Sequence, residues 1–242
     1  AAPSPFAGGD SLKPLAAMRK AIAAHMTRSL TIPHAYLTVE VDMTAVARRR
    51  DAVRREYQAR EGKSLSYVAF VTKATVEALR GHPDLNAHWT DEGHWRRKAI
   101  NVGVAVAVDD GLVVPVIRDA DRMSLHGLNL AIADVAERAR TKKLRPDDLA
   151  GGTFTVDNTG WTGSVLTLPI INAPEVAILT MEAIVRRPVV VDGPAGEAIA
   201  IRSMMNMVIG FDHRATDGAQ AGRFIGDIKR WLEAVNDQTP VW

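Results

Sequence analysis

The segment INVGVAVAVDDGLVVPVI, residues 100–117, is the most strand-like part of the chain. In its first half, isoleucine and valine alternate with asparagine, glycine and alanine, so that one face is apolar and the other carries small side chains. The sequence DDG, residues 109–111, then favours a turn that reverses the chain into LVVPVI. We therefore expect a β-hairpin that forms part of a sheet.

Segments with helical and with strand periodicity flank this hairpin on both sides. Apolar residues recur at spacings of three and four where we expect helices, and they alternate with small or polar residues where we expect strands. The expected helices cover residues 15–30, 44–60, 66–79 and 124–142, followed by a last helix that Asp217 can cap. The expected strands cover residues 36–41, 151–156, two stretches within 175–191, and 197–210. This mixture predicts an α+β fold with a mixed sheet.

Composition excludes several classes of function. The 242 residues carry a formal net charge of only +2, so no broad basic field is available to hold nucleic acid. The apolar runs are far shorter than the roughly 18 residues that indicate a membrane span. Cysteine is absent, which excludes disulfides, thiolate zinc sites and cysteine nucleophiles. We expect a cytoplasmic protein that binds neither nucleic acid nor membrane.

Histidines other than His213 are expected to have structural roles. His82, His88 and His94 are six residues apart, a spacing wider than helices and turns that bind metals usually have, so no metal site is expected. His34 follows a proline at the entrance of an expected strand, where a structural histidine is the more common case.

The sequence GFDHRATDG, residues 210–218, is the first candidate for chemistry. It places His213 in a turn after an apolar stretch, with Asp217 four residues later at the start of an expected helix. A histidine in such a position can act as a base, and a nearby acid can fix its surroundings. The same residues also fit a solvated turn in which Asp217 only caps the helix, and the local pattern alone leaves both interpretations open.

The candidate residues belong to one of several longer motifs that together resemble those of a known family. DHRATDG, residues 212–218, resembles the DHRxxDG motif of the catalytic domain of dihydrolipoyl acyltransferases, the core components of 2-oxo acid dehydrogenase complexes. The resemblance continues through the segments at 18–44, 82–89, 100–117, 151–160 and 171–179, in family order. NTGWTGSVLTLPIINAPEVAIL (158–179) and LEAVNDQTPVW (232–242) are most similar to the branched-chain members.

The resemblance implies a fold, an assembly and a reaction. The fold would be a mixed sheet with flanking helices, similar to chloramphenicol acetyltransferase, in a homotrimer with active sites between subunits. Trimers would build a larger core, a cubic 24-mer or a dodecahedral particle. The reaction would move an acyl group from acyl-dihydrolipoamide to coenzyme A, and the partners would be the 2-oxo acid decarboxylase and dihydrolipoyl dehydrogenase components.

The resemblance also implies a domain organisation. Residues 1–11 would be the remnant of a Pro/Ala-rich linker, and residues 12–242 the catalytic domain. The lipoyl group would be carried on a separate domain that is absent from this chain. The alternatives are a pyruvate-type acetyltransferase core, a structural scaffold with impaired catalysis, or an acetyltransferase with a small hydroxyl acceptor.

By motif match, His213 is the general base and Asp217 an acid that holds the site, with Arg28 as a candidate partner for Asp217. A thiol has a pKa near 8.5 and an imidazole one of about 6.5, so a positioned histidine can take the coenzyme A proton as the sulfur attacks. The C-terminal Trp242 has two interpretations: a contact between trimers, or a terminus folded onto its own subunit.

Asp157 departs from the family pattern, which commonly has serine, threonine or asparagine there as the donor to the oxyanion. An ionised carboxylate accepts hydrogen bonds and would repel an oxyanion. We expect first that another donor substitutes, with Asn158 and Ser164 as the candidate substrate-binding side chains or a backbone amide in their place. The second expectation is that Asp157 is neutral through burial, and the third is a weakened enzyme.

Exchange of Asp157 for its uncharged isostere tests these expectations. We expect Asp157→Asn to keep or raise turnover at neutral pH, because the amide can donate a hydrogen bond and carries no charge. Steady-state turnover of an acyl-dihydrolipoamide analogue measures the effect. A loss of about a hundredfold or more, comparable to removal of an oxyanion donor, would contradict it.

Overall fold

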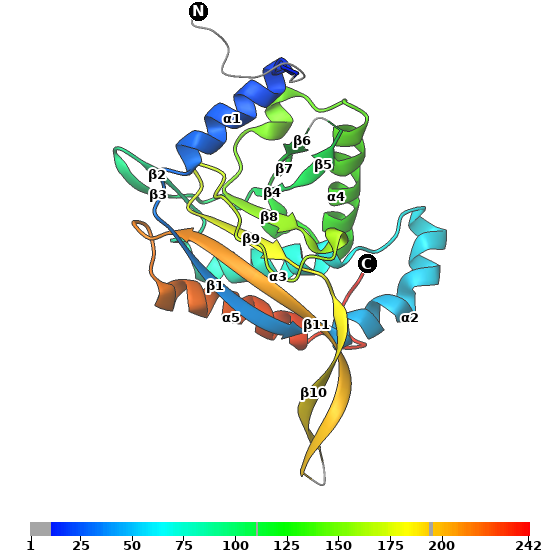
Figure 1. Ribbon diagram of the computed structural model, residues 1–242. Coiled ribbons are helices and arrows are strands. Elements are labelled where there is room, and N and C mark those ends of the chain that lie inside the picture. Colours follow the sequence, from blue (N-terminus) through cyan, green and yellow to red (C-terminus); the bar gives the residue numbers. More distant parts are fainter. Residues whose placement is uncertain (1–10, 110, 194–195) are drawn as a thin grey trace, which may run out of the picture.

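The computed structural model describes residues 11–109, 111–193 and 196–242 (Figure 1). The expected linker at residues 1–11 lies outside this part except for Ser11. The described chain forms a mixed sheet with helices packed on it, as the sequence predicts.

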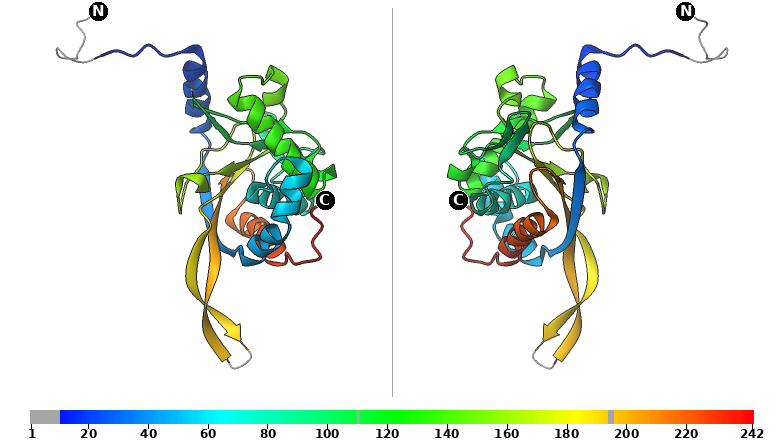
Figure 2. Two further views of the ribbon diagram at one scale, coloured as in Figure 1. Left: turned by 90° about the vertical axis from the view of Figure 1, so that its right-hand side faces the viewer. Right: turned by 90° about the vertical axis from the view of Figure 1, so that its left-hand side faces the viewer.

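The main sheet has seven strands in the order β1-β11-β9-β8-β4-β7, and β10 pairs with a separate stretch of β11. Its strands are β1 (His34–Asp42), β4 (Val102–Val104), β7 (Val116–Ile117), β8 (Phe154–Asn158), β9 (Ala177–Met181), β10 (Val185–Gly193) and β11 (Gly196–Asp212). β4, β8 and β9 are parallel to one another, whereas β11 is antiparallel to β1, β9 and β10. The sheet is therefore mixed. The N-terminal half of β11 pairs with β10, and the two form a hairpin that protrudes from the rest of the sheet (Figure 2).

Five α-helices accompany the sheet in the described residues, each close to an expected position. They are α1 (Ala17–Ser29), α2 (Thr44–Glu61), α3 (Tyr67–Gly81), α4 (Leu125–Arg140) and α5 (Gly218–Glu233). Ser66, Ser124 and Asp217 cap α3, α4 and α5 through side-chain oxygens that accept backbone N–H groups. Helices α3 and α5 lie together on one face of the sheet, while α1 lies on the opposite side (Figures 1 and 2).

The expected hairpin at residues 100–117 forms, but it is divided between two sheets. β4 pairs with β7 in the main sheet, whereas β5 (Val106–Val108) pairs with β6 (Gly111–Val113) as a separate ribbon. Gly103 is required at the crossing, because a Cβ atom there would lie 2.7 Å from Val114 Cγ1. The absence of a side chain at Gly103 therefore allows close packing of these chain segments, whereas Ala107 on the β5–β6 ribbon is exposed.

The sequence analysis missed a second hairpin. Strands β2 (Ala87–Thr90) and β3 (Gly93–Arg96) pair with each other and lie outside the main sheet. Their residues are mostly polar or aromatic, so they lack the apolar alternation that indicated the other strands.

The two faces of the main sheet differ in chemistry. The face toward α3 and α5 carries the apolar core, including Val156, Leu179, Met207 and Phe211. On the other face lie Thr155, Asp157, Thr180 and Glu182, together with buried apolar residues such as Ile178 and Val208. Polar groups thus concentrate on the face that lacks α3 and α5.

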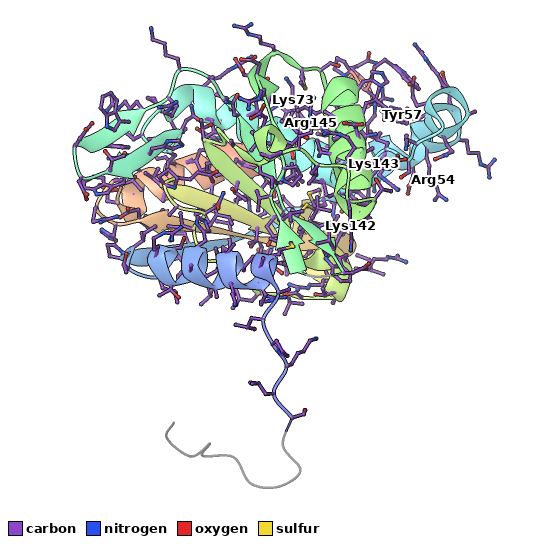
Figure 3. All side chains as sticks on the ribbon, turned by 90° about the horizontal axis from the view of Figure 1, so that it is seen from above. Arg54, Tyr57, Lys73, Lys142, Lys143 and Arg145 are labelled. Carbon is purple, nitrogen blue, oxygen red and sulfur yellow. The ribbon has the colours of Figure 1, made fainter. Side chains whose placement is uncertain are left out.

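The C-terminus folds onto its own chain. The Trp242 ring stacks on Tyr57 of α2 with centroids 5.0 Å apart, and the Arg60 guanidinium lies 4.5 Å from the Trp242 centroid. Val241 is buried. Figure 3 places Tyr57 close to α4, where its hydroxyl lies 3.1 Å from His126 Nδ1. Of the two interpretations of Trp242, the structure supports the contact within one subunit.

Among the helices of the described residues, none combines the length and the apolar composition that a membrane span requires.

Glu175 is a buried acid on the polar face. The Thr155 hydroxyl donates to its Oε2 at 2.6 Å and the Asn172 amide donates to its Oε1 at 3.2 Å. Burial, the largest effect, raises the pKa of Glu175 to about 8, against the lowering effect of these two hydrogen bonds. The folded protein therefore binds a proton at Glu175 that the unfolded chain releases at lower pH.

We expect the free energy of unfolding to fall as the pH rises from about 4.5 to about 8, the unfolded and folded pKa values of Glu175. The loss is a few kcal/mol, at roughly 1.4 kcal/mol per pKa unit. Glu175→Gln removes this contribution, because the amide has no proton to release. Denaturant titrations of both proteins at several pH values measure the difference, and parallel pH profiles would disprove it.

Candidate active site

β11 delivers His213 to the end of the sheet. The strand ends at Asp212, whose carbonyl accepts the amides of Ala215 and Thr216 at 3.0 and 3.1 Å, so the chain turns at once. The His213 amide donates to the Pro33 carbonyl at 3.0 Å, which ties the turn to the start of β1. The backbone of His213 is thus held from both sides.

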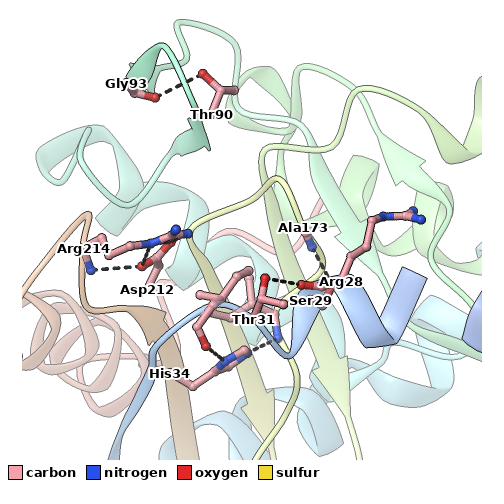
Figure 4. Close-up of polar contacts among 11 residues, drawn as sticks. Arg28, Ser29, Thr31, His34, Thr90, Gly93, Ala173, Asp212 and Arg214 are labelled. Carbon is pink, nitrogen blue, oxygen red and sulfur yellow. Dashed lines mark hydrogen bonds and ion pairs between the residues drawn. The ribbon is translucent and has the colours of Figure 1, made fainter. Parts of the chain in front are cut away.

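An ion pair holds the same turn through its side chains. Asp212 is fully buried, and its Oδ2 lies 2.7 Å from Arg214 Nη2 while its Oδ1 accepts from Arg214 Nε at 3.0 Å (Figure 4). The guanidinium also lies 5.0 Å from the centroid of the Trp89 ring on β2. The ion pair thus fixes the two residues that flank His213 in sequence, and Trp89 packs on Arg214. We call Asp212, Arg214 and Trp89 the clamp around His213.

The His213 side chain itself is exposed. Within the described chain, its ring contacts Phe211 at a centroid distance of 5.7 Å, and neither ring nitrogen has a hydrogen-bond partner. Because the backbone is fixed and both nitrogens are free, the imidazole can bind a ligand or a second polypeptide without breaking an existing bond.

His34 has the structural role that we expected. Its Nε2 accepts the Ile171 amide at 2.9 Å, which leaves Nδ1 to donate to the Ile32 carbonyl at 2.7 Å (Figure 4). Both ring nitrogens are occupied, so the ring fixes the segment before β9 against the start of β1.

Asp217 caps α5, and its Oδ1 accepts the Gln220 amide at 2.8 Å. Arg28 points away from this helix in Figure 4, and in the described part of the chain no ion pair joins it to Asp217. The structure therefore does not bring the two residues of the suggested pair together within one chain.

Asp157 lies at the end of β8, on the polar face of the sheet. Its side chain is half-buried and is paired in register with Thr180 of β9. Burial raises the pKa of Asp157 most, the charge of Glu182 raises it further, and a hydrogen bond from the Asn158 amide lowers it. The carboxyl group is thus biased toward its neutral form.

Asn158 and Ser164 lie in the segment that follows. Asn158 Oδ1 accepts the Gly160 amide at 3.1 Å, and Ser164 Oγ lies 3.0 Å from Thr167 Oγ1. Asn158 lines two neighbouring cavities of about 430 and 300 Å³, both bounded by Ser66, Val68 and Trp161. The larger is lined mainly by apolar residues of β4, β5 and α4, including Val104, Val106 and Ile132. A small apolar group therefore fits beside Asn158.

The sheet separates the candidate residues into two groups within one chain. Asp157 pairs with Thr180, and Thr180 pairs with Val208 of β11. The five residues from Val208 to His213 span roughly 16 Å at about 3.3 Å per residue. His213 and Asp157 therefore lie at different ends of the sheet and cannot act on one reacting carbon within a single chain.

The other histidines have separate partners. His82 Nε2 lies 2.7 Å from Asp227 Oδ2, His88 Nε2 lies 2.8 Å from the Gly152 carbonyl oxygen, and His94 Nε2 lies 3.1 Å from the Asp84 carbonyl oxygen. Among the residues that the structure describes, no group of three or more His, Cys, Asp or Glu side chains could hold a metal.

Two parts of the site were not found from the sequence. Glu182 comes from a segment that showed no motif of its own and approaches Asp157 through strand pairing. Trp89 ends the motif at 82–89, but its contact with Arg214 follows only from the β2–β3 hairpin. A glutamate directly after the buried strand AILTM was the available signal for Glu182.

The fold first defines a class of protein. A solved chloramphenicol acetyltransferase shares it, with a TM-score of 0.52 at 13% identity over 86% of this chain and 94% of that chain. The chain thus has the fold of these acyltransferases, and the predicted fold class is confirmed.

The chain belongs to the 2-oxoacid dehydrogenases acyltransferase (catalytic domain) family, whose model matches residues 8–239. The lipoamide acyltransferase component of the branched-chain alpha-keto acid dehydrogenase complex of Bacillus subtilis is 43% identical over 98% of this chain, which spans 55% of that relative. A probable dihydrolipoamide acetyltransferase from Listeria monocytogenes has a TM-score of 0.93 at 43% identity and covers 98% and 100% of the two chains. The cubic core of a pyruvate dehydrogenase multienzyme complex has a TM-score of 0.88 at 33% identity, with 96% of each chain covered. The family prediction is confirmed.

The clamp around His213 has a measurable effect on stability. We expect Arg214→Met to lower the free energy of unfolding by about 1–3 kcal/mol, because the buried Asp212 carboxylate loses its charged partner. Arg214→Lys keeps the charge but not the two-point geometry and is expected to lose less. Urea midpoints at one fixed protein concentration measure both variants. Equal midpoints for Arg214→Met and the wild type would contradict this role.

Proposed function

We propose that this chain is the catalytic domain of a dihydrolipoyl acyltransferase, which transfers a branched-chain acyl group from dihydrolipoamide to coenzyme A. One observation carries the proposal: a fixed turn at the end of β11 presents the exposed His213 ring with both nitrogens free. Family membership and the 43% identity to a branched-chain relative support the reaction and the acyl class.

Two copies of the chain would build each site. Because His213 and Asp157 lie at different ends of one sheet, a second chain must bring its own Asp157 to the first chain's His213. Exposed apolar side chains support such contacts near Asp157 and on the β10–β11 hairpin: Trp161, Val165, Leu166, Leu168, Val190, Ile199 and Ile201. A homotrimer meets this requirement with three equivalent sites.

The larger context follows from the proposed reaction. Trimers would assemble into a cubic 24-mer in the cytoplasm, together with the 2-oxo acid decarboxylase and dihydrolipoyl dehydrogenase components. The similarity to the cubic core of a pyruvate dehydrogenase complex supports this assembly. The lipoyl group would arrive on a separate domain, and coenzyme A would act as the second substrate.

The reaction needs one base and one donor. His213 takes the proton of the coenzyme A thiol as its sulfur forms a bond to the thioester carbon, and the carbonyl electron pair moves to the oxygen. The tetrahedral intermediate then collapses, the bond to the lipoyl sulfur breaks, and the imidazolium returns the proton to that sulfur. The acyl group and one proton change places, so no oxidant, metal or acyl-enzyme is required. Asp217 would hold the start of α5 behind this turn through its helix cap.

The oxyanion needs a donor from the Asp157 end of the sheet. Asp157 in its neutral form, the Asn158 amide group and the Ser164 hydroxyl are the candidates there. One such donor is typically worth about 3–4 kcal/mol in the transition state. The apolar cavity beside Asn158, lined by Val104, Val106 and Ile132, would take the acyl chain.

Co-assembly of two inactive variants tests the shared site. His213→Ala is expected to lose about 10²–10⁴-fold in turnover through loss of the base. Asp157→Leu is expected to lose about 10²–10³-fold, because it removes the donor atoms at that position. Co-expressed, the two variants should recover activity, since some interfaces combine an intact His213 from one chain with an intact Asp157 from the other. Turnover of isobutyryl-dihydrolipoamide with coenzyme A measures it.

The control is a chain with both substitutions, co-expressed with the His213→Ala chain, which leaves no imidazole in any site. No recovery in the test mixture, despite mixed oligomers, would reject the shared site. Wild-type assemblies without transferase activity would favour the structural scaffold, and a preference for acetyl over isobutyryl and isovaleryl donors would favour the pyruvate type.

A further inference from the structure

A group of hydroxyls surrounds Glu182, the residue after β9. Thr159 Oγ1 donates to its Oε2 at 2.7 Å, Thr167 Oγ1 donates to the same oxygen at 3.3 Å, and Thr180 Oγ1 donates to its Oε1 at 3.1 Å. The glutamate is almost completely buried. A buried carboxylate with several hydrogen-bond donors is stabilised in its charged form.

The hydroxyl network extends toward the candidate substrate-binding residues. Ser164 Oγ lies 3.0 Å from Thr167 Oγ1, and Thr167 Oγ1 also lies 3.2 Å from Thr159 Oγ1. Because Thr167 has one proton and donates it to Glu182, Ser164 is the donor to Thr167, and these two linked hydroxyls polarise each other in support of the negative charge. Ser164 is thus the far end of a network that stabilises Glu182.

Asp157 lies on the same face but has a different environment. It pairs with Thr180, and the alternation of side chains puts Thr180 and Glu182 on that face. Its carboxyl group accepts a hydrogen bond from the backbone N–H of Asn158, and within the described chain no hydroxyl donates to it. Two acids thus share one face, but only Glu182 has several donors.

This difference acts together with burial, which raises the pKa of Asp157 most. When two carboxyl groups lie close together, the one with more donors keeps the charge and the other retains the proton. Glu182 and Asn158, the residue after Asp157, line the same cavity of about 300 Å³, so a ligand can enter the space beside this end of β8 and β9. A neutral carboxyl group there has an O–H bond to donate, as an oxyanion requires.

We propose that Glu182 is a positioning residue whose hydroxyl-bound carboxylate keeps the proton on Asp157, so that the Asp157 O–H donates to the oxyanion during acyl transfer. The inference rests on the proposed function for that last step alone. It also gives a role to the aspartate that departs from the family pattern, without requiring a loss of activity.

Other ionisable groups near Asp157 are few in the described part of the chain. Tyr67 of α3 lines the smaller cavity with Asn158 and Glu182, and Arg140 of α4 lines the larger one. The charge of Glu182 acts on Asp157 to raise its pKa, in the same direction as burial. The β-strand neighbours of Asp157 are Thr180 and, one strand further, Val208, which carry no charge.

Infrared difference spectra between the wild type and Asp157→Asn, taken across a pH series, isolate the C=O band of a protonated carboxyl group at position 157. We expect this band at pH 7 in the wild type. In Glu182→Gln it should disappear at a lower pH, because the like charge that favours the proton is removed. The decrease in turnover at alkaline pH should also shift to lower pH in Glu182→Gln. In Asp157→Asn, the part of this decrease that the ionisation of Asp157 causes should be absent.

Two further variants sharpen the test. Thr180→Val removes one hydrogen-bond donor from Glu182, suits a buried strand, and should also lower the pH at which the Asp157 band disappears, because the carboxylate that favours the proton on Asp157 then has one donor fewer. Glu175→Gln is the matched control: it replaces the other buried acid of this face, which already holds a proton at pH 7, and should leave the Asp157 band unmoved. These two variants keep the test valid if Glu182→Gln folds poorly.

An ionised Asp157 at pH 7 in the wild type, or a band that Glu182→Gln and Thr180→Val leave unmoved, would overturn the inference. The spectra do not depend on catalysis. A protonated Asp157 in a protein without transferase activity would therefore reject the proposed function while the effect of Glu182 on Asp157 stands.

Discussion

The hydrogen bonds of β11 are the constraint on which the rest of the structure depends. This 17-residue strand pairs with β1, β9 and β10, and it ends at the residue before His213. Its register with β9, and the register of β9 with β8, set the separation between His213 and Asp157 along the sheet. A slip of one residue would exchange the apolar and polar faces, so burial of Met207, Ile209 and Phe211 against the helices fixes the register. The distance between His213 and Asp157 along the sheet is therefore determined by core packing.

The same alternation explains how buried acids are tolerated. The helix-facing side of the sheet supplies the continuous apolar core, so the opposite face can carry polar groups if they are hydrogen-bonded. Glu175 receives donors from Thr155 and Asn172, and Glu182 receives three threonine hydroxyls. Hydroxyl and amide donors satisfy these oxygens without adding a counter-ion. Each acid thus has its own set of hydrogen-bond donors even though the two share a face.

Much of the fold could be predicted from local sequence, and the failures have physical causes. Helices α3, α4 and α5 have a capping residue followed by apolar residues at spacings of three and four, so their starts and types were predictable. The division of residues 100–117 between two sheets depends on pairing with β8, far along the chain, where the Val156 carbonyl accepts the Ala105 amide; no local pattern contains this partner. The β2–β3 hairpin is mostly polar because it lies outside the main sheet, and periodicity cannot detect such strands.

The candidate site shows the same limit. His213 and Asp157 are contained in motifs and could be identified, because each motif is continuous in sequence. The distance between them could not be predicted, because it follows from the pairing of β8, β9 and β11. The residues that set their chemistry were hidden for the same reason: Trp89 reaches Arg214 from another hairpin, and Glu182 reaches Asp157 across a strand. A motif thus identifies which side chains can react, whereas the sheet determines which groups tune them. At position 157, where the motif residue is an acid, the tuning groups decide whether that acid is a donor or a repelling charge.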